Sequence, residues 1–84
     1  MSQKIRQDIS IGKRIRQLRK ELHLTQEDVV LKMQLQGCDI SRSIYSQIEC
    51  GTYNIRVSEL LILSRILQCD MNMIFEVSIS ESVE

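Results

Sequence analysis

The sequence predicts an all-α fold, a compact domain of five short helices. Apolar residues recur every three or four positions along most of the chain, which is the period of helices that bury one face. Residues that cap or end helices stand between these stretches. The 84 residues include no proline and only three glycines, so little interrupts the helical pattern.

Two helices are predicted in the first half of the chain. The first runs from about Asp8 or Ser10 to Leu22, on an apolar stripe at i, i+4, i+7 and i+11 that starts at Ile11. Thr25 is placed to cap the second helix, and Asp28 occupies the acid position of a capping box. This second helix extends from about Gln26 to Met33 or Leu35.

The stretch DISRSIYSQIECG, residues 39–51, predicts a third helix with two distinct faces. Ser41 is a suitable N-cap, Gly51 a suitable C-terminal stop, and Ile40 with Tyr45 can form a hydrophobic staple. The opposite face of this helix is polar. It consists of Arg42, Ser43, Ser46 and Gln47.

The last third of the chain predicts a loop, two helices and a tail. Residues 52–57 form the loop, and Ser58 is placed to cap a fourth helix that reaches about Gln68. Asp70 is placed to cap a short fifth helix through Phe75. Beyond it, Val77 and Ile79 alternate with serines at the period of a strand, which leaves a short C-terminal strand or a frayed tail.

The composition argues against an enzyme, a metal site and a membrane protein. The three cysteines form no CxxC pair, and the chain has one histidine and no HExxH, GxSxG or glycine-rich loop. We therefore expect reduced thiols, no metal and no cofactor. The longest apolar run is too short to span a bilayer, and residues 1–10 do not resemble a signal peptide, so we expect a cytoplasmic protein.

Charge is distributed unevenly along a chain whose net charge is zero. Residues 1–20 contain seven lysines and arginines but one acid, whereas the last nine contain three glutamates and no base. A basic head of this kind is either a solvated helix face or a surface for a polyanion.

Three stretches together carry a family resemblance: IGKRIRQLRKELHLTQEDVVLKM, ISRSIYSQIECG and VSELLILSRILQCDMNMIF. In this order and spacing they resemble the Cro/cI-type (XRE) helix-turn-helix family, whose domain is lambda-repressor-like. The resemblance covers about residues 9–75. It implies a basic N-terminal arm at 1–8, a DNA-binding domain at 9–76, and an acidic tail or dimerisation strand at 77–84.

The resemblance also implies roles for individual residues. A third helix in the major groove would read bases with Arg42, Ser43, Ser46 and Gln47. Backbone contacts would come from Thr25 and Gln26 at the start of the second helix, and from Asn54 and Arg56 in the loop. An ion pair between Arg19 and Glu49, the cap Ser41 and the stop Gly51 would be structural.

The chain departs from the common family spacing between the second and third helices. Residues 34–39 make this connection about five residues longer than usual. Either the second helix extends by a turn or the linker loops out.

Two functions remain open from the sequence. The first is a sequence-specific regulator of transcription, a repressor, that binds double-stranded DNA as a homodimer through its C-terminal region. The second is a protein-interaction module, an antirepressor or antitoxin-like partner that keeps the scaffold without binding DNA. The family resemblance favours the first, whereas the zero net charge and the acidic tail mildly favour the second.

Overall fold

The computed structural model describes residues 4–5 and 11–74. The elements follow in the order β1 (Lys4–Ile5), α1 (Ile11–Glu21), α2 (Gln26–Leu35), α3 (Arg42–Cys50), β2 (Ile55–Arg56), α4 (Val57–Ile66) and a helical turn at 71–74. The five helical segments confirm the predicted all-α fold. Phe75 and the C-terminal strand predicted at Val77 and Ile79 lie outside the described residues.

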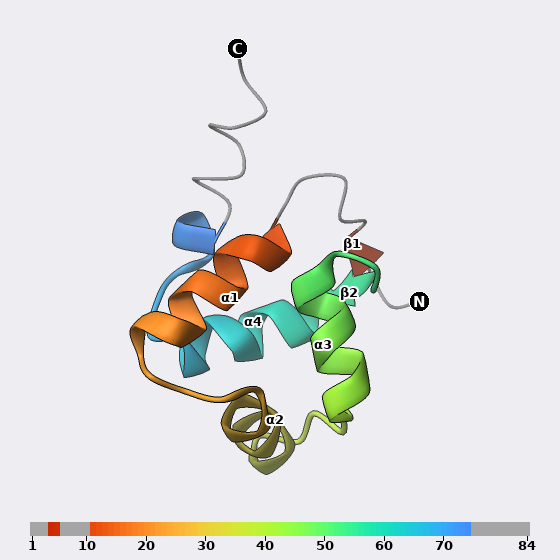
Figure 1. The fold of residues 1–84 in the computed structure, drawn as a ribbon. Helices are drawn as coiled ribbons and strands as arrows, with labels where there is room; N and C mark the ends of the chain where they lie inside the picture. The colour runs from red at the N-terminus through yellow and green to blue at the C-terminus, as the bar shows by residue number, and fades with distance from the viewer. Residues whose placement is uncertain (1–3, 6–10, 75–84) are drawn as a thin grey trace.

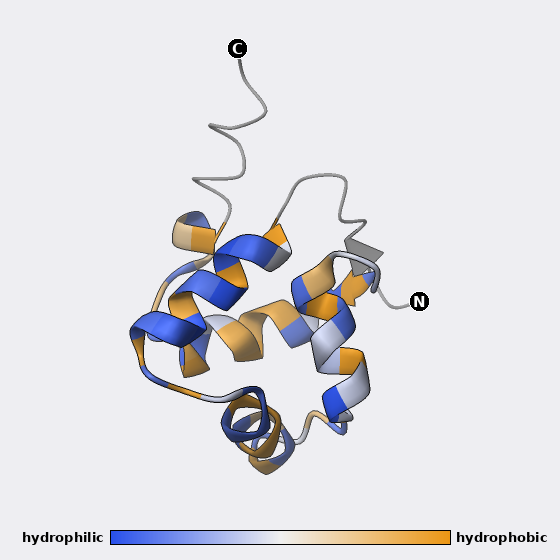
Figure 2. Ribbon diagram, in the orientation of Figure 1, coloured by the Kyte–Doolittle hydropathy of each residue, from blue (hydrophilic) through white to orange (hydrophobic). Residues whose placement is uncertain are grey.

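The helices pack around one core (Figure 1). α3 packs against both α1 and α2, and α2 also packs against α4. Figure 2 shows α4 as the most hydrophobic of the helices. The side chains that are completely or almost completely buried come from every helical segment and from β2. They are Ile11, Ile15, Val29, Met33, Tyr45, Ile48, Ile55, Leu60, Leu63 and Ile74.

Local capping defines the ends of α2 and α3 as the sequence predicts. The hydroxyl of Thr25 accepts the amide N–H of Asp28 at 3.0 Å, and the Asp28 carboxylate accepts the amide N–H of Thr25 at 2.8 Å. Ser41 Oγ accepts the amide N–H of Ile44 at 3.1 Å. Gly51 ends α3 with φ of 81°, a conformation that side chains disfavour.

The prediction for residues 52–58 was wrong in two respects. Residues 55 and 56 form β2, which pairs antiparallel with β1, where a loop was expected. Ser58 is not the cap of α4, because the helix already begins at Val57 and its N-cap is Arg56. The carboxylate of Glu59 accepts the amide N–H of Arg56 at 2.9 Å, which fixes this earlier start.

In the long connection between α2 and α3 the linker loops out, which is one of the two alternatives that the sequence left open. α2 reaches Leu35, and residues 36–41 loop out before α3. Gly37 adopts a left-handed conformation with φ of +88°. The loop is tied back to α2, since Gln34 Nε2 donates to the carbonyl of Ile40 at 3.0 Å and the Cys38 amide donates to the carbonyl of Met33 at 2.9 Å.

No helix within the described residues is long and apolar enough to cross a membrane.

Candidate nucleic-acid interface

The polar face of α3 shares an open hollow with the first residue of α2. The hollow is lined by Gln26, Arg42, Ser43, Ser46 and Gln47. The structure therefore brings together all four residues predicted to read bases, together with one residue predicted to contact the backbone. Their hydroxyl, amide and guanidinium groups can recognise base edges as donors and acceptors.

Arg42 is held only weakly in the free protein. Its Nη1 lies 3.3 Å from Glu27 Oε1, and the two side chains are 63% and 71% exposed. Exposed pairs of this kind are worth about 0–1 kcal/mol. The guanidinium can therefore leave Glu27 for another acceptor at little cost.

The side chains of Thr25 and Gln26 are both engaged within the protein. Thr25 uses its hydroxyl as the cap of α2, and Gln26 Nε2 donates to Glu49 Oε1 at 3.0 Å. The start of α2 can therefore bind an anion through its backbone N–H groups and the positive end of the helix dipole.

The predicted pair of Arg19 and Glu49 forms beneath this surface. Arg19 Nε donates to Glu49 Oε2 at 2.6 Å, and Arg19 Nη2 donates to Glu49 Oε1 at 3.1 Å. Arg19 Nη1 also donates to the carbonyl of Leu24 at 2.8 Å. With the bond from Gln26, this buried network joins the end of α1, the start of α2 and the last turn of α3.

The protonation of the network follows from its geometry. The hydrogen bond to Glu49 is the main reason that the pKa of Arg19 lies above its ordinary value. Burial by itself would raise the pKa of Glu49, but the hydrogen bonds from Arg19 and Gln26 outweigh burial, so the pKa lies below its usual range. Both groups therefore carry their charges near neutral pH.

Tyr45 has a place in this network that sequence reasoning missed. It was predicted as a core residue of the staple, and it is fully buried. Its hydroxyl lies beside Arg19 and Glu49 without reaching hydrogen-bond geometry to any described residue. Burial raises the pKa of this phenol, so it remains protonated. No local pattern in the sequence signals that the ring ends next to an ion pair.

Asn54 and Arg56 lie apart from the hollow, around β2. Ile55 between them is fully buried, whereas both of them are exposed. Because side chains alternate along an extended chain, both point away from the core on the same side. The backbone of Lys4 pairs with that of Arg56, so β1 lies at this same edge of the molecule.

The described residues contain no cluster of side chains suited to bind a metal ion. No group of three or more His, Cys, Asp or Glu side chains there is arranged to hold an ion. The three cysteines, Cys38, Cys50 and Cys69, are all free thiols.

Comparison with known proteins identifies several relatives. A family model described as helix-turn-helix matches residues 15–74. The restriction-modification controller protein C.AhdI from Aeromonas hydrophila has a similar structure, with a TM-score of 0.70 and 25% identity over 80% of this chain and 94% of its own. No curated protein matches the chain.

Two further similar structures contain DNA. The controller protein C.Esp1396I, solved as a tetramer in complex with its natural 35 base-pair operator, has a TM-score of 0.69 and 25% identity over 89% of this chain and 92% of its own. SinR, described as the master regulator for biofilm formation and solved in complex with DNA, has a TM-score of 0.67 and 26% identity over 77% of this chain and 97% of its own.

Proposed function

We propose that this chain, which belongs to the helix-turn-helix family, is a sequence-specific DNA-binding regulator of transcription. In this proposal it acts as a repressor in the cytoplasm. The single observation that carries the proposal is the hollow in which the polar face of α3 meets the start of α2. α3 enters the major groove, and the start of α2 rests on the phosphate backbone. We assign the protein no catalytic role.

Arg42 and Gln47 are the strongest candidates for base recognition. An arginine can bind O6 and N7 of guanine as a fork, and a glutamine can bind N6 and N7 of adenine. Each matched bidentate pair is worth about 1–3 kcal/mol of discrimination. Ser43 and Ser46, which line the same hollow, have short hydroxyls that accept several partners and therefore specify less.

Backbone contacts in this proposal come from both sides of α3. The N-terminus of α2, with Thr25 and Gln26, holds one phosphate through its amides. Asn54 and Arg56, which are exposed around β2, hold phosphates on the other side. These contacts position α3 without selecting the sequence.

The regulator acts as a homodimer in this proposal. C.Esp1396I assembles as a tetramer on its operator. In this chain, Leu61 on α4 is 43% exposed and Met73 in the final helical turn is 40% exposed, so the C-terminal part offers apolar surface for a second copy. A symmetric dimer would bind two half-sites about one helical turn apart. Sedimentation that shows only monomers at high concentration, even with DNA, would contradict the dimer.

Fluorescence anisotropy tests the DNA-binding function directly. The protein is titrated against the duplex upstream of its own gene and against a random duplex, at several salt concentrations. A regulator binds the upstream duplex more tightly, and its affinity falls with a log–log slope of about 0.9 per neutralised phosphate. Absence of binding to any duplex at low salt would favour the protein-interaction module, for which the zero net charge argues.

A further inference from the structure

α1 carries three cations that have no structural partner among the described residues. Two of its basic residues have structural partners, because Arg19 pairs with Glu49 and Arg14 Nε donates to the carbonyl of Met73 at 2.9 Å. The other three are exposed and make no hydrogen bond or ion pair with a described residue. They are Lys13, Arg16 and Lys20, which we call the α1 basic face.

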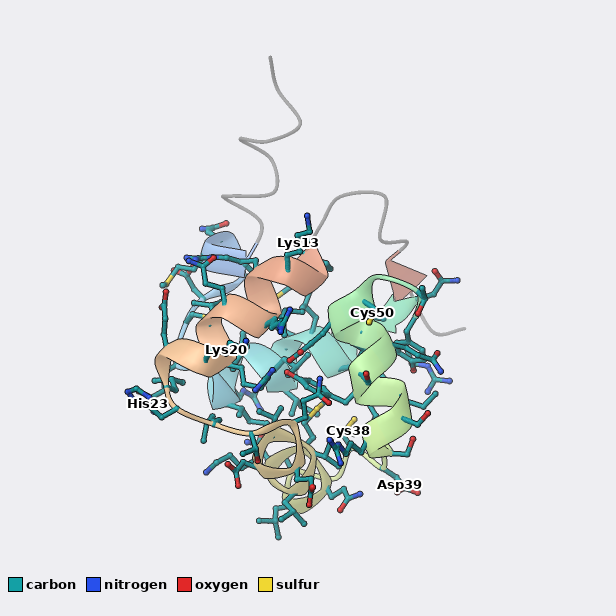
Figure 3. All side chains as sticks on the ribbon, in the orientation of Figure 1. Lys13, Lys20, His23, Cys38, Asp39 and Cys50 are labelled. Atoms are coloured by element: carbon teal, nitrogen blue, oxygen red, sulfur yellow. The ribbon has the colours of Figure 1, made fainter. Side chains whose placement is uncertain are left out.

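The three cations lie on one side of the helix. They follow each other at i, i+3 and i+7, which places them within about one sixth of the helix circumference. Figure 3 shows Lys13 near the start of α1 and Lys20 near its end. An open hollow on this side is lined by the three cations with Gln17 and Glu21. Glu21 forms no ion pair with the three cations, and its carboxylate accepts a hydrogen bond from Gln17 Nε2 at 3.4 Å.

This arrangement works against the stability of α1. Like charges three or four residues apart on a helix repel each other. The first turn of α1 contains no acid, so the positive charge of Lys13 also lies close to the positive end of the helix dipole. A bound polyanion would offset both effects.

The helix that carries the α1 basic face packs on α3 and leads into the chain before α2. A Cβ on Gly12 would be 2.5 Å from the carbonyl oxygen of Ile48, so the start of α1 packs directly on the last turn of α3. Arg16 follows Gly12 by one turn and borders this contact. At the other end, the bond from Arg19 to the carbonyl of Leu24 places the end of α1 beside the chain that enters α2.

We infer that Lys13, Arg16 and Lys20 bind the phosphates of the DNA strand that continues past the N-terminus of α2. The inference rests on the proposed function and extends its footprint from α2 and α3 to α1. Seven residues of helix span about 10 Å. One DNA strand places a phosphate about every 3.4 Å along the axis. The face is therefore long enough to reach successive phosphates of one strand.

The salt dependence of DNA binding tests this inference. The full chain with Lys13→Gln, Arg16→Gln and Lys20→Gln is compared with the unchanged chain by anisotropy, on the upstream duplex and on a random duplex. The log–log slope should fall by about 2.7, since each lost phosphate contact removes about 0.9. The ratio of the two affinities should stay the same, because phosphate contacts carry no sequence information.

Lys32→Gln is the control variant. Lys32 is also an exposed cation, but it lies in the last turn of α2, at the opposite end of the helix from Gln26. The variant should leave the slope unchanged. A thermal melt shows whether the triple variant folds, and we expect its Tm to equal or exceed that of the unchanged chain, since repulsion within α1 is relieved.

The result that overturns the inference is a folded triple variant with the original slope. Failure of the unchanged chain to bind any duplex would instead overturn the proposed function. The two failures are therefore distinct.

Discussion

Arg19 and Glu49 meet in a buried fork of two hydrogen bonds, 2.6 and 3.1 Å long, thirty residues apart in the chain. The fork fixes the last turn of α3 against α1. Gln26 adds a third bond to the same carboxylate at 3.0 Å, so the start of α2 is set by it too. The two elements that present the candidate interface are therefore oriented by a single buried carboxylate.

Removal of the carboxylate should destabilise the protein strongly. Glu49→Ala leaves the Arg19 guanidinium buried without its partner, and we expect a loss of about 3–5 kcal/mol in the free energy of unfolding. Glu27→Ala is the control, because it breaks the exposed pair with Arg42 and should cost less than about 1 kcal/mol. Urea denaturation measures both, and equal losses would contradict a buried network.

Acid should weaken the same network. The pKa of Glu49 is lower in the folded protein than in the unfolded chain. Its contribution to stability is therefore fully present above the unfolded pKa of about 4.3 and is lost as the pH falls through the lower folded value. The difference in unfolding free energy between the unchanged protein and Glu49→Gln should shrink in that range, as followed by urea midpoints from pH 7 downward. A difference independent of pH would contradict the assignment.

Two serines should differ sharply although both lie at the start of a helix. Ser41→Ala removes the cap of α3 and should cost about 1 kcal/mol of unfolding free energy. Ser58→Ala should change stability little, because Ser58 lies exposed inside the first turn of α4 and is not its cap. Thermal melts of the two variants side by side check this. A larger loss at Ser58 would restore the cap position expected from the sequence.

Two arginines should affect DNA binding in different ways. Arg42→Ala should relax base preference by about 1–3 kcal/mol, because it removes a candidate base contact. Arg56→Ala should weaken binding to all sequences alike and lower the salt slope by about 0.9. Competition anisotropy with single-base operator variants separates the two effects. Loss of base preference in Arg56→Ala would contradict the roles assigned to Arg42 and Arg56.

Much of the fold was predictable because its signals are local. The start of α2 and both ends of α3 follow from Thr25, Ser41 and Gly51, each of which acts on backbone groups within four residues. The apolar stripe of α1 is likewise a pattern within one helix. The pairing of Arg19 with Glu49 is not local, and it was predicted only through the family resemblance.

The sequence by itself thus determined which helices form and which residues form the polar face of α3. Only the tertiary structure decided that residues 55–56 pair with β1 and that the side-chain amide of Gln26 donates to Glu49. It also showed why residue 12 is glycine, since any side chain there would strike the backbone of α3. The physical reason is that contacts between distant segments depend on how whole helices pack, and packing leaves no period or cap in the sequence around either partner.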